Sequence, residues 1–407
     1  MDFLKDPVTF LANQLVLWLT GLGLPEGVVR FLSFSIGAAI LATSSLLFVI
    51  FLIWFERKLI GRVQDRLGPN RLGPFGLFQP FADMLKIFTK EYVTPSGVDP
   101  VPYNLAPVLA VSSVMAIWAV IPFANTIYGV DLDVGVVFVL AVGGLAQLGI
   151  ILAGWGSNNK YALLGGFRAL AQLLSYEIPM VITLLIPVML AGTLSLTGMV
   201  TAQDVPFFAV APLAALIFFI ANLAEVSRAP FDLPEADSEI VAGFNIEYSG
   251  LKFGFFYVAE FLHGFTSALL FATVFLGGWR GPLAEEIPIL GFIYFAIKTS
   301  LVYLTILLVD ATVPRFRIDQ LLNFSWKLLT PLALALLVAM ALVDRAMVGM
   351  GVESIWIRLP VFLALNAGLF AAGAYFLDRA RRRAPRPVVS GGPRPVARPE
   401  NFTMQPK

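Results

Sequence analysis

The chain has 407 residues; 58% of them are apolar, 14% are charged and the formal net charge is +1. Soluble domains carry about a quarter charged residues, so this composition indicates a membrane protein. Cysteine is absent and histidine occurs once, at His263. These counts exclude disulfides, thiolate-bound iron–sulfur clusters, zinc ribbons and a haem held between two histidines. Any electron carriers that act with this chain must therefore belong to other chains.

Apolar stretches of about twenty residues, the length that crosses roughly 30 Å of hydrocarbon, recur along the chain. They predict an all-α polytopic membrane protein with about nine transmembrane helices. Phe10 to Leu24 is shorter and interrupted by glycine, so it predicts a helix at the membrane interface. The nine predicted spans are Phe31 to Phe55, Leu105 to Ile127, Gly135 to Trp155, Leu170 to Ala191, Phe207 to Leu223, Phe256 to Leu276, Ile289 to Val309, Trp326 to Val343 and Ile355 to Phe376.

Lys and Arg in the short loops predict the orientation, because cytoplasmic loops carry an excess of both. Most of them fall on one face of the predicted bundle, which should be cytoplasmic. The N-terminus should then lie outside and the C-terminus inside. The opposite face carries only Lys5, Arg30, Arg280, Arg345 and Arg358.

We predict a single transmembrane domain, residues 1–377, followed by a disordered basic tail, residues 378–407. The tail is rich in Pro, Arg and Gly and has few large apolar residues, so it should not pack into a core. The longest connections are the loops 56–104 and 225–254, and both belong to the predicted cytoplasmic face.

Several carboxylates fall in or beside the predicted spans, where an unpaired charge is costly and suggests a function. Glu177 precedes Pro179, whose kink frees a backbone carbonyl. Glu225 ends the fifth span and Glu260 is early in the sixth. The loop between them contains Asp232, Glu235, Asp237, Glu239 and Glu247. Carboxylates crowded in a poor dielectric hold protons more tightly, which is the property that a proton relay needs.

The acidic loop also has a simpler explanation, in which its carboxylates face water or pair with Arg228, Lys252 and Arg168. The large apolar residues of the same loop favour the functional interpretation, because a free aqueous loop would not hold them. Lys298, within the seventh span, is predicted to pair with one of these acids or with a partner chain.

The first cytoplasmic loop is basic and contains an apolar segment at helical spacing, Phe75 to Phe88. Turn residues at Gly68 to Asn70 precede it, so we expect an amphipathic helix on the membrane surface. One interpretation is a docking surface for a soluble partner or a lipid-like substrate. The other is attraction to anionic lipid, worth about 1 kcal/mol per basic residue.

Three long polar blocks lie between the spans: ERKLIGRVQDRLGPNRLGPFGLFQPFADMLK, GWGSNNKYALLGGFRALAQLLSYEIPM and AEVSRAPFDLPEADSEIVAGFNIEYSGLKF. A fourth, weaker block is PRFRIDQLLNFSWKLLTP. Together they resemble one family, the quinone-site membrane subunit (the H subunit) of bacterial respiratory complex I, the NADH:quinone oxidoreductase. The resemblance extends from Phe51 to about Pro331.

The resemblance implies a subunit that forms the lipid-side entrance and lower wall of a quinone chamber and couples quinone reduction to proton translocation. The residues implied to line the chamber or its mouth are Glu56, Arg57, Arg62, Asp83, Lys86, Arg315 and Arg317. The residues implied to form an acidic, proton-coupling funnel are Glu177, Glu225, Glu235, Asp237, Glu239, Glu247 and Glu260.

The resemblance also implies the chain's surroundings. The location would be the bacterial inner membrane, and quinone would be the substrate of the complex. This chain would bind no cofactor and no metal, while FMN and iron–sulfur clusters would sit in partner subunits. The implied partners are the peripheral-arm quinone-site and iron–sulfur subunits and small membrane-arm subunits next to an antiporter-like chain; no nucleic acid is implied.

Three positions depart from the family pattern. Asp237 stands where glutamate is expected, and Ser227 where asparagine is frequent. Asp310 stands where arginine is expected, which puts that side of the implied tunnel in doubt. The lone His263, one turn after Glu260, can be read as a proton carrier or quinone ligand, but a single histidine is more often a packed, hydrogen-bonded residue.

Two other functions stay open at this point. The chain could be the homologous subunit of a membrane-bound hydrogenase-type complex, in which no quinone need bind. It could also be a stand-alone ion-coupled transporter, which predicts inverted repeats and broken helices in matching halves. The sequence has no such repeat, and its long polar loops favour a subunit of a larger assembly.

Overall fold

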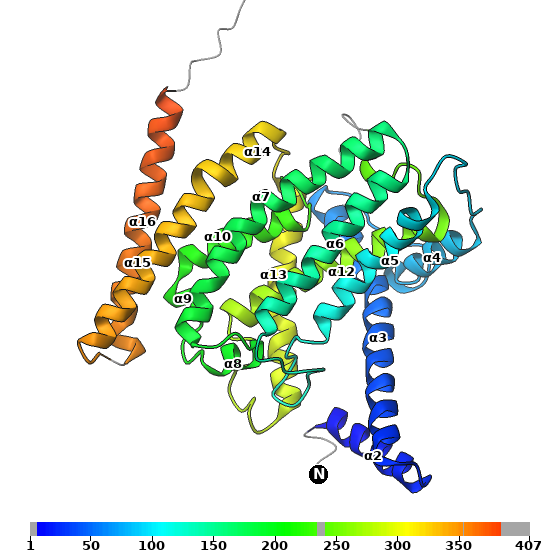
Figure 1. Cartoon of the computed structure of the whole chain (residues 1–407), viewed down its shortest axis with the longest axis horizontal. Helices are drawn as coiled ribbons and strands as arrows, with labels where there is room; N and C mark the ends of the chain where they lie inside the picture. Colours follow the sequence, from blue (N-terminus) through cyan, green and yellow to red (C-terminus); the bar gives the residue numbers. More distant parts are fainter. Residues whose placement is uncertain (1–5, 234–240, 353, 384–407) are drawn as a thin grey trace, which may run out of the picture.

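The computed structural model describes residues 6–233, 241–352 and 354–383, and every regular element among them is helical. Eight helices are long and apolar enough to cross a membrane, which confirms the predicted all-α polytopic class. In chain order (Figure 1) the elements are α2 (Pro7–Gly21), α3 (Glu26–Val63), η1 (Pro74–Gly76), α4 (Gln79–Thr89), α5 (Pro100–Trp118), α6 (Gly135–Gly156), α7 (Lys160–Ala191), α8 (Leu196–Thr201), α9 (Phe207–Val210), α10 (Pro212–Glu225), η2 (Gly243–Asn245), α12 (Gly250–Phe275), α13 (Pro288–Thr312), α14 (Ile318–Phe324), the π-helical turn η3 (Ser325–Leu329), α15 (Thr330–Gly349) and α16 (Ile355–Arg383).

The fifth predicted span, residues 207–223, is wrong as one continuous helix. It is divided at Ala211 into α9 and α10, and α10 has 14 residues, roughly 21 Å at 1.5 Å per residue. The backbone N–H of Leu213, at the start of α10, donates to Asn366 Oδ1 of α16 at 3.1 Å. A short helix with a broken start is tolerated at membrane depth because the surrounding protein satisfies its backbone.

The N-terminal helices lie at one edge of the bundle. α3 has 38 residues, roughly 57 Å at 1.5 Å per residue, and α2 crosses its lower end (Figure 1). Asp6 caps α2 and accepts hydrogen bonds from Thr9 N at 3.1 Å and Thr126 Oγ1 at 2.6 Å. Burial acts to raise the pKa of Asp6, but the hydrogen bonds from Thr126 and Thr9 outweigh it, so this pKa lies below its ordinary value.

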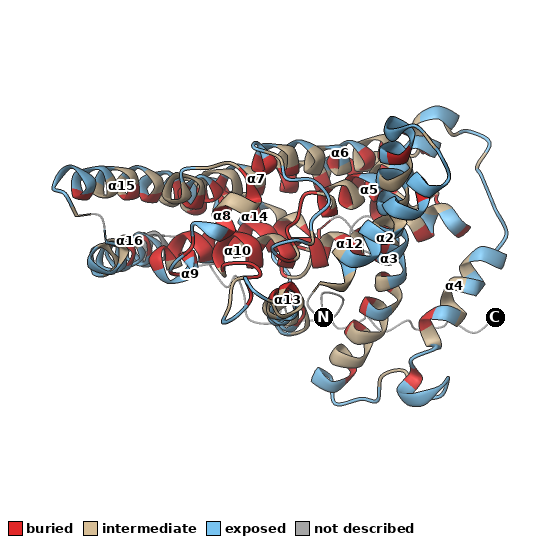
Figure 2. Cartoon of the chain, turned by 90° about the horizontal axis from the view of Figure 1, so that it is seen from below, coloured by how far each residue is buried: buried red, intermediate tan, exposed pale blue. Residues whose placement is uncertain are grey.

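The core lies where α7, α10 and α12 pack, and Figure 2 shows the buried residues concentrated on α10 and its neighbours. Glycines let the backbones approach. A Cβ on Gly149 of α6 would lie 3.0 Å from the carbonyl oxygen of Ala106 in α5. A Cβ on Gly165 of α7 would lie 2.7 Å from the carbonyl carbon of Gly243 in η2. Small residues therefore set the spacing between helices, as in other membrane bundles.

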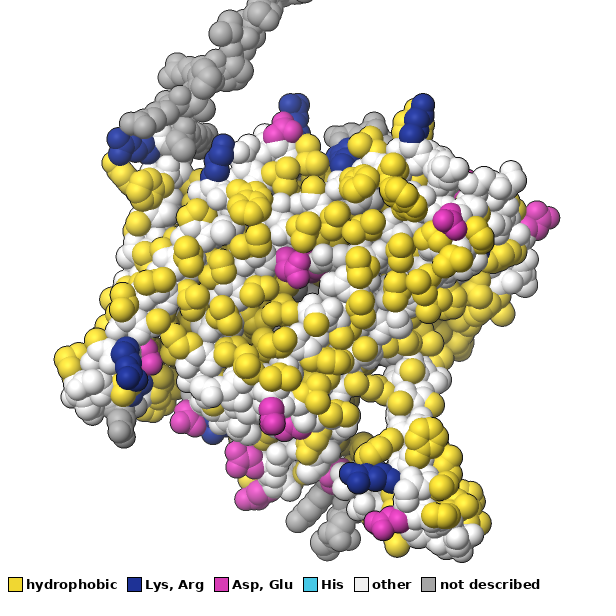
Figure 3. Space-filling model, viewed as in Figure 1, with side chains coloured by type: hydrophobic (Ala, Val, Ile, Leu, Met, Phe, Trp, Pro, Cys, Tyr) yellow, Lys and Arg dark blue, Asp and Glu magenta, His cyan; other side chains and the backbone are white. Residues whose placement is uncertain are grey.

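The outer surface is largely apolar. Figure 3 shows a hydrophobic band across one face, with Lys and Arg gathered mainly at its upper margin. Large side chains such as Phe31, Trp356 and Phe376 are exposed in the isolated chain. A soluble protein does not expose such a continuous surface, so lipid or partner subunits must cover it.

The predicted amphipathic segment of the first loop is confirmed as α4, although the helix begins at Gln79 rather than at Phe75. Phe75 itself lies in η1 with a positive φ of 55°. Lys58 of α3 holds this turn, because its Nζ donates to the carbonyls of Pro69 at 2.7 Å and Phe75 at 3.1 Å. The loop is thus tied to the end of α3.

At the other end of the chain, α16 continues to Arg383, so the described part of the chain beyond residue 377 is helical. The remainder, residues 384–407, lies outside the described residues, and its disorder stays a prediction.

Candidate functional site

A guanidinium group surrounded by carboxylates lies where α3, α12 and α13 meet the loop after α10. Arg228 Nη1 lies 2.8 Å from Glu56 Oε1 and 3.8 Å from Asp310 Oδ2, and Nη2 lies 3.5 Å from Glu260 Oε1. The ring of Phe261 lies 5.3 Å from the guanidinium carbon. Burial disfavours the charged guanidinium, but the three carboxylates outweigh this and raise the pKa of Arg228 above its ordinary value. We call these four charged residues the Arg228 cluster.

Asp310 belongs to this cluster, which explains why a carboxylate suits a position where the resemblance predicts arginine. Asp310 Oδ1 accepts the backbone N–H of Ala229 at 2.9 Å, and Oδ2 faces Arg228. An arginine here would place two guanidinium groups together. Asp310 therefore joins α13 to the loop that follows α10, instead of presenting the expected cation.

A second polar contact joins α3 to the amphipathic helix α4. Arg57 donates to Asp83, and Lys86 Nζ lies 3.9 Å from the other oxygen of Asp83. The side chain of Lys86 is 74% exposed, and Arg62, one turn and a half beyond Arg57, is also exposed. Of the predicted mouth residues, the structure thus brings three together and leaves Arg62 apart.

Arg315 and Arg317 lie between α13 and α14. Arg315 Nη2 donates to Asp232 Oδ2 at 3.4 Å, and both side chains are about one-third exposed. Arg317 is the N-cap residue of α14. The backbone N–H of Phe316, between them, donates to the carbonyl of Pro230 at 3.1 Å. This pairing places the two arginines beside the loop that carries Arg228.

A pair of carboxylates joined by an amide lies deeper in the bundle. Gln147 Nε2 of α6 donates to Glu225 Oε1 at 3.1 Å and to Glu177 Oε2 at 3.4 Å. Glu225 ends α10 and Glu177 lies on α7, so three helices meet at this pair. Glu225 Oε2 is buried without a hydrogen-bond partner among the described residues. A buried oxygen of this kind requires water or a proton.

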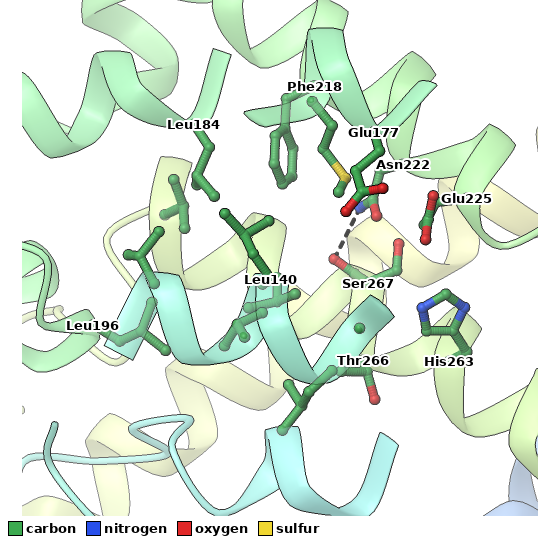
Figure 4. Close-up of a pocket in the computed structure, with 17 residues that line it drawn as sticks. Leu140, Glu177, Leu184, Leu196, Phe218, Asn222, Glu225, His263, Thr266 and Ser267 are labelled. Carbon is green, nitrogen blue, oxygen red and sulfur yellow. Dashed lines mark hydrogen bonds between the residues drawn. The ribbon is translucent and has the colours of Figure 1, made fainter. Parts of the chain in front are cut away.

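Two small cavities adjoin the carboxylates. The first, of about 50 Å³, is lined by Glu177, Glu225 and His263 together with apolar residues. Figure 4 shows its two ends: Glu177, Glu225 and His263 gather at one, and Leu184 and Leu196 line the other. The second, of about 90 Å³, is lined by Glu225, Glu260 and His263. Glu225 and His263 are the lining residues that the two cavities share.

Glu247 is held separately, at the end of the acidic loop. Its Oε1 accepts a hydrogen bond from Asn159 Nδ2 at 2.6 Å, and its backbone carbonyl accepts one from Tyr103 at 2.9 Å. Burial raises the pKa of the neighbouring Tyr248, whose hydroxyl donates to the carbonyl of Tyr103. The predicted funnel residues Glu235, Asp237 and Glu239 lie outside the described residues.

Sequence reasoning missed some of this site. Gln147 was overlooked, although a glutamine inside an apolar span is itself a signal, because an unpaired amide is costly there. Arg228 was considered only as a partner in a solvated loop. The expectation for Lys298 was wrong: its Nζ donates to the backbone carbonyls of Gly278 at 2.9 Å and Arg280 at 2.8 Å, and it pairs with none of the described acids.

Metal binding has no support in the described part of the chain, where no three His, Asp or Glu side chains gather in a way that would hold an ion. What the described residues do offer is a set of carboxylates, one guanidinium and one imidazole, arranged along two cavities of water size.

Comparisons with known proteins agree on one family. A family model described as NADH dehydrogenase matches residues 36–341. The H subunit of NADH-quinone oxidoreductase from Dehalococcoides mccartyi is 50% identical over 293 residues, which are 72% of this chain and 82% of that protein. The protein of the same name from Geobacillus kaustophilus is 48% identical over 314 residues, 77% of this chain and 94% of that protein. A second relative of this kind, from Geobacter sulfurreducens, is 48% identical over 294 residues, 70% of this chain and 88% of that protein.

Proposed function

The chain belongs to the NADH dehydrogenase family and is a membrane subunit of the NADH-quinone oxidoreductase complex, and from this premise we propose that it forms the lower wall of the quinone chamber and couples quinone reduction to proton translocation. The observation that carries the proposal is the pair Glu225 and Glu177, bridged by Gln147 beside a cavity of about 50 Å³. Carboxylates joined in this way can share and pass a proton.

The proposed chamber wall consists of the Arg228 cluster and the α3–α4 contact. Glu56 and Arg57 are adjacent in α3, and one pairs with Arg228 while the other pairs with Asp83 of α4. The exposed apolar residues of α4, Phe81 and Leu85 among them, suit a helix at a membrane surface, where a lipid-like quinone would enter. Arg315 and Arg317 would extend the wall on the α13 side.

The proposed coupling works through charge. When quinone in the chamber gains or loses charge, the carboxylates nearest to it change their proton occupancy, and the change passes along polar groups that are in contact. Glu260 belongs both to the Arg228 cluster and to the second cavity. It would therefore link the chamber wall to Glu225 and Glu177. Glu235, Asp237, Glu239 and Glu247 are proposed to extend the same acidic group along the loop.

We further propose that the complex lies in the bacterial inner membrane, with the N-terminus of this chain outside and its C-terminus in the cytoplasm. The support is the excess of Lys and Arg on one face and the opposite ends at which α2 and the end of α16 lie (Figure 1). The proposed neighbours are the peripheral quinone-site and iron–sulfur subunits, which would hold FMN and the clusters, and small membrane-arm subunits.

The test is Glu225→Gln in the assembled complex in membrane vesicles. Because glutamine keeps the size of the side chain but carries no acidic proton, we expect NADH:quinone reduction and proton pumping to fall about tenfold or more. NADH oxidation by an artificial acceptor, which needs only the flavin end of the complex, should be unchanged.

The matched control is Glu286→Gln, which makes the same chemical change at an exposed position before α13. Its quinone reduction and pumping should equal those of the unmodified complex. Full quinone-dependent activity in the Glu225→Gln complex, assembled to the normal level, would contradict the proposed coupling role.

A further inference from the structure

The single histidine of this chain occupies a position that the proposed function does not yet use. His263 lies on α12, three residues after Glu260, so the two side chains share a face of the helix. Glu260 itself pairs with Arg228. His263 is therefore the next polar residue inward from the Arg228 cluster along α12.

His263 stands between the two cavities. It lines both the cavity of about 90 Å³, which also touches Glu260, and the cavity of about 50 Å³, which also touches Glu177. Glu225 is the other lining residue that the cavities share. In Figure 4 the imidazole lies at the polar end of the smaller cavity, on the same side as the carboxylate of Glu225.

The smaller cavity has the features of a hydrated site. About 15 Å³ of such volume accommodates one water, so the two cavities have room for roughly three and six waters. Two buried polar atoms that face the smaller cavity, Glu225 Oε2 and Ser267 Oγ, have no hydrogen-bond partner among the described residues. Buried polar atoms of this kind are normally satisfied by internal water. The imidazole likewise makes no hydrogen bond to another described residue, so it is free to bind such water.

Imidazole chemistry fits this place. A neutral imidazole carries a proton on one ring nitrogen and a lone pair on the other, so it can accept a proton on one side and release a different proton on the other. No net charge remains on the ring after both transfers. The ring has then exchanged its tautomer and must return to the first tautomer before the next proton passes.

We propose that His263 is a proton-relay residue that carries protons between the Glu260 cavity and the Glu177 cavity, with Glu225 beside it. Glu260 and water on one side supply a proton to the nearer ring nitrogen, and the farther nitrogen releases its proton to water and the Glu225–Glu177 pair. The inference rests on the proposed coupling function and names a residue through which it works.

The test compares His263→Gln and His263→Glu in the assembled complex in membrane vesicles. The two replacements have nearly the same size, but only glutamate can take up and release a proton. We expect His263→Gln to lower quinone reduction and proton pumping about tenfold, and His263→Glu to be at least fivefold more active than His263→Gln. NADH oxidation by an artificial acceptor should be unchanged in both, and equal subunit content should show that both complexes assemble.

The rate ratio between H2O and D2O provides a second measurement, in case His263→Glu does not assemble. Proton transfer past position 263 should limit the rate in His263→Gln, so the solvent isotope effect should exceed that of the unmodified complex. A normal rate in His263→Gln, or a reduced rate with an unchanged isotope effect, would overturn the relay. Equal activity of assembled His263→Gln and His263→Glu would do the same.

Glu225→Gln, measured in parallel, separates the two proposals. If Glu225→Gln is inactive and His263→Gln is fully active, the coupling function stands and the relay fails. If both are fully active, the coupling function itself fails.

Discussion

Replacing Arg228 with methionine would remove the guanidinium from between Glu56, Glu260 and Asp310. The side chains of Arg228 and Glu56 are 11% and 9% exposed, so little water is available to solvate the abandoned carboxylate. Removing one partner of a buried ion pair costs about 3–5 kcal/mol, because the other charge stays buried. We therefore expect the free energy of unfolding to fall by about that amount, roughly two to four powers of ten in the equilibrium constant.

The measurement is unfolding of the purified full-length chain in mixed micelles by increasing denaturing detergent, followed by the fluorescence of its tryptophans. The matched control is Arg315→Met, which removes an arginine whose pair with Asp232 is much more open, with side chains 38% and 31% exposed. Exposed ion pairs contribute about 0–1 kcal/mol. The control should therefore lose at most about 1 kcal/mol.

A double-mutant cycle can assign the effect to particular carboxylates. Residues in contact have coupling energies of about 0.5–3 kcal/mol. The coupling of Arg228→Met with Glu56→Gln should exceed its coupling with Asp310→Asn, because the nearest atoms of the two pairs are 2.8 Å and 3.8 Å apart. Equal losses in Arg228→Met and Arg315→Met, or zero coupling with Glu56→Gln, would refute the reasoning that this cluster is an interdependent buried unit.

Two further predictions concern packing and capping. Gly165→Ala should destabilise the chain by about 1–3 kcal/mol and lower assembly of the complex, because its Cβ would lie 2.7 Å from the backbone of Gly243; Gly166→Ala, whose nearest contact is 3.5 Å, should be tolerated, and equal assembly of the two would contradict the close packing. Asp6→Ala should weaken the N-terminus of α2 by about 0.5–2 kcal/mol and raise the mobility of a spin label placed there. Since the pKa of Asp6 is lowered in the folded chain, its contribution is present above the ordinary carboxyl value and is lost as the pH falls through the folded value; the mobility in the unmodified chain should rise over that range, and a pH-independent signal would argue against this capping role.

Much of the fold follows from the sequence because a membrane restricts the alternatives. Apolar runs of spanning length must be helical where no water is available to the backbone, and eight of the nine predicted spans are confirmed as parts of long helices. The ninth, residues 207–223, has the right composition but not the right structure. Its break at Ala211 depends on the Asn366 side chain, which is more than 150 residues away in sequence.

The candidate site was predicted in composition but not in arrangement. Glu177, Glu225 and Glu260 were identified as carboxylates out of place in apolar surroundings, and that reasoning needs only neighbours in sequence. Gln147, which bridges two of them, and Asp310, which supports Arg228, could not be assigned these roles without contacts between distant helices.

The sequence by itself determined that this is a helical membrane protein, which residues carry charge into it and which family its polar blocks resemble. These properties depend on composition and local spacing, because the energy of placing a residue in hydrocarbon is largely a property of that residue and its helix. Only the tertiary structure decided that four helices or loops bring three carboxylates to one guanidinium, and that His263 stands between two cavities. Pairing energies in a poor dielectric change steeply with distance, so the partner of each charge is fixed by packing and not by position along the chain.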